Sequence, residues 1–294
     1  MRTGVPTEPG GLPPASTLRG RRALVTGSTR GIGAALAERL AAEGADVVLT
    51  GRTRSDDDSR LPGSLESVAR RLSSYGGRVA TVAADLTDAD ARQELVPEAE
   101  RLLGGPIDIL VNNAAAAIYQ PLADFPLHRR RLVFEANVHA PLDLAQAVLP
   151  GMVERREGWI VNLSSATAKI RTGPPFALVP PGTAMAVYGS SKAALNRLTN
   201  GLGTELYGTG VRVNTVEPRF GVLTEGADVL VGDQVDTSIM ESIEEMVEGA
   251  LILCRCPADV TGNVTVSLDL LEQWQVPVRA LDGRPASTST EELA

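Results

Sequence analysis

Short runs rich in β-branched and aliphatic residues alternate with longer segments of helical periodicity along most of this chain of 294 residues. The helical segments carry apolar residues three or four positions apart, as at Ile32, Leu36 and Leu40. Strands separated by helices of this length form a parallel sheet covered on both faces. The pattern therefore predicts one doubly wound α/β domain with about seven parallel strands. The runs expected to be strands are RALVTG, ADVVLTG, RVATVAADL, PIDILVNNA, WIVNLSS, VRVNTVEP and NVTVSL.

The two ends of the chain differ in composition from this alternating region. Residues 1–18 are crowded with proline and glycine and contain little that could be buried, so we expect a flexible arm. Residues 19–272 are expected to form the single domain. Residues 273–294 are expected to form a C-terminal tail, which from Leu281 onwards is mobile or lies across a neighbouring subunit.

Charge and cysteine content exclude several classes of function. The net charge of −8 and the pI near 5.0 argue against a surface that binds nucleic acid or anionic membranes. Cys254 and Cys256 have no histidine cluster beside them, so neither a metal site nor a disulfide framework is expected. Because the chain shows no signal-like segment and no apolar run of about eighteen residues, we expect a cytoplasmic protein.

The first predicted strand ends in TGSTRGIG, which then opens a helix. Gly27 allows a tight turn, Gly31 allows the backbone to approach a pyrophosphate, and Gly33 allows close packing of helix against strand. Backbone amides at a helix start attract phosphate. The spacing Gly-xxx-Gly-x-Gly differs from the usual dinucleotide fingerprint, but the strand–turn–helix context of that fingerprint is present. We therefore expect a Rossmann-type dinucleotide site whose loop residues are Gly27, Ser28, Thr29, Arg30, Gly31, Ile32 and Gly33.

The end of the second predicted strand indicates which dinucleotide binds. NAD sites usually place an acidic residue there, which binds the ribose 2′-hydroxyl. This chain has Gly51 and Arg52 at that point, and Arg30 lies within the glycine loop. Because a guanidinium can hold a 2′-phosphate through two hydrogen bonds, NADP(H) is favoured over NAD(H). The other interpretation is that Arg52 and Arg54 only solvate a loop, next to the acidic run Asp56–Asp58.

The segment AVYGSSKAAL places Tyr188 and Lys192 four residues apart. On a helix this spacing is about one turn, so the two side chains would share a face. Such pairs are commonly ordinary contacts. The spacing alone therefore leaves two interpretations open, a surface contact or a proton donor beside the cation that tunes it.

Six motifs follow one another in the order typical of the short-chain dehydrogenase/reductase family, which the chain resembles from about Arg21 to Asp269. Each motif is modest alone, but six in one register are specific. The resemblance implies the family but no particular substrate. The motifs are TGSTRGIG, DL at Asp85–Leu86, NNAA at Asn112–Ala115, EAN ending at Asn137, NLSS ending at Ser165, and YGSSK at Tyr188–Lys192.

The resemblance implies a catalytic role for each of four residues. Tyr188 would exchange a proton with the substrate oxygen as hydride moves to or from the nicotinamide. Lys192 would hold the nicotinamide ribose and favour the phenolate, since a free phenol titrates only near pH 10. Ser165 would hydrogen-bond the substrate carbonyl, and Asn137 would hold a water that links Lys192 to solvent. The resemblance also implies that the cofactor is contacted by Asp85, Leu86, Asn113, Ala114 and Ala115.

One departure from the family pattern lies after the sixth predicted strand. Pro218 is present, but Arg219 replaces the glycine that usually follows it. Because a non-glycine residue is costly at positive φ, we expect an altered turn, with the arginine approaching the pyrophosphate or an acidic substrate group. Val222 and Thr224 are the expected remaining contacts to the cofactor, together with Pro218.

A second departure is an insertion between Ser165 and Tyr188, which are farther apart than is usual in the family. The insertion either walls the substrate pocket and favours an apolar substrate, or forms a surface excursion. Because Lys169 and Arg171 are positively charged, an acyl-carrier or coenzyme A thioester is a further candidate substrate. The apolar residues expected to line the pocket are Ile170, Phe176, Leu178 and Val179.

The main interpretation is an oxidoreductase that moves hydride between NADP(H) and a carbonyl or secondary alcohol. Residues 221–241 would form a substrate lid. The family usually assembles through two long helices, here about Leu127–Arg155 and Tyr188–Tyr207, so a homodimer or homotetramer is expected. The alternative is a catalytically idle module that senses NADP(H) or scaffolds a partner, and a dehydratase or epimerase is a third interpretation.

Overall fold

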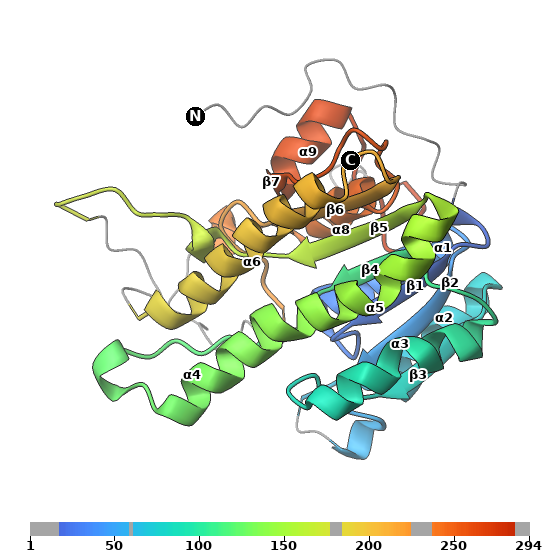
Figure 1. Cartoon of the computed structure of the whole chain (residues 1–294), viewed down its shortest axis with the longest axis horizontal. Coiled ribbons are helices and arrows are strands. Elements are labelled where there is room, and N and C mark those ends of the chain that lie inside the picture. Colours follow the sequence, from blue (N-terminus) through green and yellow to red (C-terminus); the bar gives the residue numbers. More distant parts are fainter. Residues whose placement is uncertain (1–17, 59–60, 177–183, 225–236, 286–294) are drawn as a thin grey trace, which may run out of the picture.

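A computed structural model describes residues 18–58, 61–176, 184–224 and 237–285 of the chain. Within these residues, seven parallel strands form a single sheet in the order β3-β2-β1-β4-β5-β6-β7 (Figure 1). The predicted doubly wound α/β fold with about seven parallel strands is confirmed. The strands are β1 (Arg22–Thr26), β2 (Asp46–Gly51), β3 (Val79–Ala83), β4 (Ile109–Asn112), β5 (Gly158–Leu163), β6 (Val211–Glu217) and β7 (Val264–Val266).

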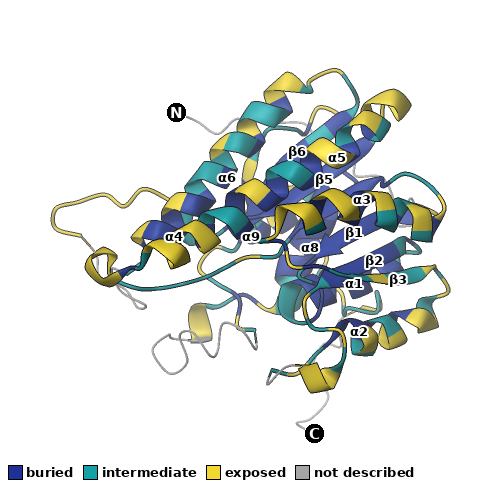
Figure 2. Cartoon of the chain, turned by 60° about the horizontal axis from the view of Figure 1, so that its bottom comes forward, coloured by how far each residue is buried: buried dark blue, intermediate teal, exposed yellow. Residues whose placement is uncertain are grey.

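Helices cover both faces of this sheet, and their exposed sides form the outer surface (Figure 2). No helix in the described ranges is both long and apolar enough to cross a membrane. The helices are α1 (Gly31–Ala42), α2 (Leu65–Leu72), α3 (Ala89–Leu103), α4 (Leu127–Phe134), α5 (Ala140–Arg155), α6 (Ala186–Glu205), α8 (Ile243–Leu253) and α9 (Ser267–Trp274).

Alternate residues of each central strand enter two separate cores. In β1, Ala23 and Val25 face a core shared with α1, α2, α8 and α9. Leu24 faces the other core, which is shared with α3 and α5. Strands covered on both faces are apolar throughout, which explains why the strand runs in the sequence are nearly continuous.

The order of strands reverses between β1 and β4, where ligands bind in folds of this class. Asn113, which follows β4, clasps the glycine loop that follows β1. Its Nδ2 donates to the carbonyl oxygens of Thr26 at 2.9 Å and Gly27 at 3.1 Å. Its backbone N–H donates to Thr26 Oγ1 at 3.0 Å. These bonds fix the glycine loop relative to the end of β4.

The predicted boundary between domain and tail, after residue 272, falls inside α9. Beyond this helix, Val276, Val278 and Leu281 pack against the core that contains β1. The last described residues are joined by a bridge between Arg279 and Pro285. These three partly buried apolar side chains extend the contacts of that core beyond α9. Of the predicted arm, only Leu18 is described, and it is buried in the same core.

We predict that Gly33→Ala destabilises the protein, because a Cβ at this position would collide with the Gly27 carbonyl oxygen and with Asn113 Nδ2. Overpacking of this kind costs about 1–3 kcal/mol, and urea unfolding would measure it. The control is Gly201→Ala in α6, whose Cβ would approach only the flexible end of Arg197 at 3.3 Å. That variant should keep or gain stability, because alanine favours a helix interior. Equal effects of the two substitutions would contradict the close packing of Gly33 against Gly27 and Asn113.

Candidate active site

A cavity of about 400 Å³ opens at the carboxyl ends of the central strands, beside the clasped glycine loop. It brings together most of the residues predicted to bind a cofactor. Those that line it are Gly27, Thr29, Arg30, Gly31, Ile32, Arg52, Asp85, Leu86, Asn113, Ala114 and Ala115. Thr224 lines it as well, but Pro218, Val222, Tyr188 and Lys192 do not.

Two predicted loop residues support the cavity from behind instead of lining it. Ser28 is fully buried, and its Oγ accepts a hydrogen bond from the backbone N–H of Thr50 at 2.9 Å. Gly33 packs against Asn113. Several other residues line the cavity but were not predicted from the sequence, because they belong to no site motif that assigns them a role and only the fold brings them to the cavity. They are Thr53, Ala84, Thr87, Ala116, Leu132 and Ala136.

The glycine loop and the start of α1 fit a pyrophosphate group. Gly27 and Gly31 have φ values of +65° and +55°, which favour glycine, and they turn the backbone towards the cavity. No side chain caps α1, and its first turn carries no acidic residue. The amides at this helix start therefore suit an anion. Thr224 lies against the loop, since a Cβ on Gly31 would come within 3.4 Å of its side chain.

The two candidate cations for a 2′-phosphate differ in how they are held. The Arg30 guanidinium donates to the carbonyl oxygens of Pro62 and Gly63, both at 2.9 Å. Arg52 is largely exposed, and its nearest charged partner is Asp85, 4.0 Å away. This places Arg52, rather than Arg30, as the more adaptable cation at the end of β2.

Asp85 is held in its ionised form. Burial opposes ionisation of this carboxylate, but hydrogen bonds from the Thr87 N–H and hydroxyl and the charge of Arg52 outweigh it, so the pKa of Asp85 is lowered. The two hydrogen bonds to Asp85 Oδ1 measure 3.0 Å and 2.8 Å. The carboxylate is therefore a fixed acceptor at this side of the cavity.

Asn137 lies in a π-helical turn, Glu135–His139, between α4 and α5. Its Oδ1 accepts from the Ala116 N–H at 2.8 Å, and its Nδ2 donates to the Ala116 carbonyl at 3.1 Å. The same Nδ2 donates to Ser191 Oγ at 3.0 Å. The Ser191 hydroxyl in turn donates to the carbonyl of Tyr188 at 2.7 Å. Asn137 thus connects the segment after β4 to the turn of α6 that carries Tyr188.

Tyr188 and Lys192 share one buried face of α6, as their spacing indicated. Lys192 Nζ donates to the Leu163 carbonyl at the end of β5 at 2.7 Å and lies 6.0 Å from the centre of the Tyr188 ring. Tyr119, which sequence reasoning did not identify, packs edge-on against Tyr188 with ring centres 5.5 Å apart. No short motif marks Tyr119, since only the fold brings it to this ring.

Burial shapes the ionisation of this pair. It raises the pKa of Tyr188, as does the neighbouring Tyr119, while a hydrogen bond with Ser165 acts in the opposite direction. Burial lowers the pKa of Lys192 to about 8. At neutral pH Tyr188 therefore carries its proton and Lys192 remains mostly charged.

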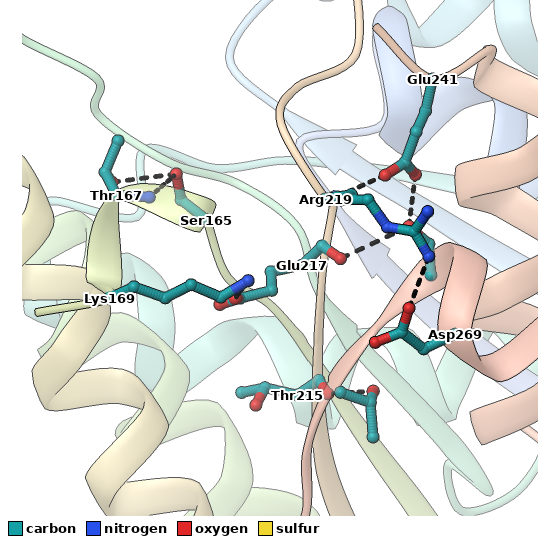
Figure 3. A network of polar contacts seen from close by, with 10 residues as sticks. Ser165, Thr167, Lys169, Thr215, Glu217, Arg219, Glu241 and Asp269 are labelled. Carbon is teal, nitrogen blue, oxygen red and sulfur yellow. Dashed lines mark hydrogen bonds and ion pairs between the residues drawn. The ribbon is translucent and has the colours of Figure 1, made fainter. Parts of the chain in front are cut away.

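Ser165 begins the short turn Ala166–Ala168, and its Oγ accepts from the N–H of Thr167 at 3.2 Å and the hydroxyl of Thr167 at 2.9 Å (Figure 3). This turn lies directly on α6, because a Cβ on Gly189 would come within 2.5 Å of the Thr167 carbonyl oxygen. The fold therefore brings Ser165 beside Tyr188, although they are far apart in the sequence.

The sequence of residues 21–234 matches the family model described as short chain dehydrogenase. The chain belongs to the short-chain dehydrogenase family. Among its relatives, gluconate 5-dehydrogenase of Gluconobacter oxydans (strain 621H) is 34% identical over 273 residues, which cover 87% of this chain and 99% of that protein. L-xylulose reductase of Bos taurus is 33% identical over 263 residues, which cover 86% and 96%.

A solved structure supports the same placement. The 3-oxoacyl (acyl-carrier-protein) reductase from Agrobacterium tumefaciens C58, with NADP bound, matches with a TM-score of 0.69 at 33% identity. The match covers 85% of this chain and 93% of that one. The protein is therefore an oxidoreductase of the short-chain dehydrogenase family, and the fit of its glycine loop to a pyrophosphate supports a nicotinamide dinucleotide as its cofactor.

In this short-chain dehydrogenase, Arg219 does not approach the cavity. Its guanidinium donates to Asp269 Oδ1 on α9 at 2.6 Å, and its backbone N–H donates to the Glu241 carboxylate. The expectation that this arginine reaches a pyrophosphate or an acidic substrate group was wrong, because a carboxylate on α9 pairs with it. Arg219 is also absent from the described residues with positive φ, so the turn accommodates a side chain without strain.

The described part of the insertion lines a groove of about 440 Å³ beside α6. Ile170 and Phe176 both line it and are largely exposed. Neither Ser165 nor Tyr188 lines this groove. Leu178 and Val179, the other two residues expected in the pocket wall, lie outside the described residues, as does the predicted lid from residue 225 to residue 236.

Lys169 fastens the start of this insertion to the sheet (Figure 3). Its Nζ lies 3.1 Å from Oε1 of Glu217, a carboxylate buried at the end of β6. Burial raises the pKa of Glu217, and the positive charge of Lys169 limits that rise. The buried carboxylate therefore depends on Lys169 for its charge compensation.

We predict that Lys169→Met destabilises the protein by about 1–2 kcal/mol at pH 8, a value below that for fully buried pairs because Lys169 is half exposed. A carboxylate whose pKa is raised on folding costs stability when ionised, so the loss should shrink as the pH falls through the pKa of Glu217. Urea unfolding at several pH values measures this. The double variant with Glu217→Gln should lose most of the pH dependence, and a loss that is constant with pH would refute the ion pair as its cause.

Proposed function

We propose that the protein is an NADP(H)-dependent oxidoreductase that interconverts a carbonyl compound and a secondary alcohol, with Tyr188 as the general acid and base. The observation that supports this most directly is the convergence of Ser165, Tyr188 and Lys192 at the end of β5. Names of relatives, gluconate 5-dehydrogenase and L-xylulose reductase, agree with this reaction class. The substrate is a small molecule, and an acyl thioester remains within the class.

Four side chains have separate roles in the proposed reaction. The bound cofactor supplies or accepts the hydride. Tyr188, protonated at neutral pH, gives its proton to the carbonyl oxygen during reduction and takes it from the alcohol during oxidation. The charged Lys192 stabilises the phenolate that this transfer leaves behind. Ser165 orients the carbonyl through a hydrogen bond, and Asn137 holds the backbone that presents Tyr188.

Preference for NADP(H) rests on charge at the end of β2. Arg52 lines the cofactor cavity, and no acidic residue stands directly after Gly51. The structure of the Agrobacterium reductase, which has NADP bound, is in agreement. Among the described residues the charged partner of Arg52 is Asp85, 4.0 Å away, and a guanidinium held this loosely can turn towards a 2′-phosphate.

We also propose a cytoplasmic homodimer or homotetramer. Two long helical segments, Leu127–Arg155 and α6, keep exposed faces on one side of the sheet. On α6, the exposed Ala186 and Ser190 are small enough to admit a second helix closely.

We predict that Tyr188→Phe lowers turnover of ketones by at least about a hundredfold while NADPH still binds, because only the transferable proton is lost. NADPH oxidation across a panel of ketones and NADPH fluorescence titration would measure the two effects. Tyr207→Phe, an exposed tyrosine beyond α6, is the matched control and should behave as wild type. Tight NADPH binding by the wild type without turnover of any ketone would favour the idle sensor or scaffold.

We predict that Arg52→Ala raises the Kd for NADPH about tenfold and leaves the Kd for NADH unchanged, because it removes a charge-assisted contact to the 2′-phosphate alone. Direct titration with both dinucleotides measures this. Arg54→Ala removes a cation that is also exposed but does not line the cavity, and it serves as the control. Equal weakening for both dinucleotides would mean that Arg52 does not select between them.

A further inference from the structure

The hydrogen bonds from Thr167 restrict the Ser165 hydroxyl to one role, that of a donor. A hydroxyl carries one hydrogen and two lone pairs. The backbone N–H of Thr167 donates to Ser165 Oγ at 3.2 Å, and the hydroxyl of Thr167 donates to the same oxygen at 2.9 Å (Figure 3). With both lone pairs taken, the Ser165 hydroxyl can only donate, and its hydrogen bond with Tyr188 acts to lower the pKa of that phenol.

We propose that Thr167 is a positioning residue that keeps Ser165 a hydrogen-bond donor to the reacting oxygen, an inference that rests on the proposed function. A donating serine stabilises a substrate carbonyl as negative charge develops on it. It also stabilises the phenolate of Tyr188. A serine with a free lone pair could instead accept a hydrogen bond from the Tyr188 hydroxyl, which would hold the proton of Tyr188 away from the substrate oxygen.

Thr167 is held in place from two sides, which makes it fit for this task. Its carbonyl oxygen lies against Gly189 on α6, where a Cβ would come within 2.5 Å. Two residues further on, Lys169 pairs with the buried Glu217 at the end of β6. The turn that carries Thr167 is thus pinned to a helix at one point and to a strand at another.

Of the charged and titratable groups around this turn, some face Tyr188 and others do not. Tyr119 and Lys192 face Tyr188 from the segment after β4 and from α6. Lys169 and Glu217 face each other on the other side of the turn, and neither contributes to the pKa of Tyr188. A change in the hydrogen bonds of Ser165 can therefore be detected at Tyr188 without a change in these ion pairs.

The test compares Thr167→Val, which removes the hydroxyl and keeps the shape, with Thr167→Ser, which keeps the hydroxyl. Thr204→Val is the matched control, because Thr204 is an exposed threonine near the end of α6 whose hydroxyl donates to the Asn200 carbonyl of its own helix. In Thr167→Val we expect kcat to fall about fivefold with KM within about twofold, because the lost interaction acts on the transition state. The apparent pKa of alcohol oxidation should rise, since a weaker donor stabilises the phenolate less.

Thr167→Ser should restore both values, and Thr204→Val should match the wild type. Crystal structures give a readout that needs no activity: Ser165 should hold one rotamer in wild type and Thr167→Ser but leave it, or split between two, in Thr167→Val. Wild-type kinetics and an unmoved Ser165 in Thr167→Val would overturn the inference, as would a Thr167→Ser variant as impaired as Thr167→Val. Absence of ketone turnover in the wild type would instead overturn the proposed function, and the rotamer of Ser165 would still decide the role of Thr167.

Discussion

Parallel pairing of β1 with β4, where the strand order reverses, is the constraint on which the rest of the site depends. It leaves the loops after these strands free to diverge, and Asn113 then fixes the glycine loop against the end of β4. The uncapped start of α1 faces the resulting cavity, so the most positive end of that helix dipole is directed at an incoming pyrophosphate. Binding of the cofactor is therefore built into backbone geometry, and the side chains around it adjust selectivity.

The residues proposed to be catalytic depend on a second contact, between α6 and the end of β5. Lys192 reaches from the helix to the Leu163 carbonyl, and Gly189 lets the turn after Ser165 lie directly on the helix. This arrangement buries Tyr188 and Lys192 together and moves their pKa values in opposite directions. Burial disfavours the charged form of both groups, so a protonated phenol stands beside an ammonium whose pKa is already lowered to about 8. The pair is suited to move a proton when a negative oxygen develops beside it.

Most of the fold and the glycine loop could be predicted from the sequence. Buried parallel strands and amphipathic helices give patterns among residues that are close together in the chain. The Tyr188–Lys192 pair could be found for the same reason, since both lie on one helix turn. Contacts between residues that are far apart in the sequence could not be predicted in this way. Tyr119 and the packing of Val276 and Leu281 depend on which segments the topology brings together, and no local spacing records that.

The chain departs from the family pattern at the insertion after Ser165 and at Arg219. In both places a cation of the altered segment pairs with a carboxylate at the carboxyl end of the sheet. Glu217 anchors the inserted segment after β5 through Lys169. Glu241 accepts the backbone N–H of Arg219, while Asp269 pairs with its guanidinium, so the segment after β6 is fixed without the usual glycine. These anchors lie away from the residues that line the cofactor cavity. Each departure is therefore accompanied by a carboxylate from another part of the fold that pairs with its cation, so the altered segments are held by long-range ion pairs and not by neighbouring residues in the sequence.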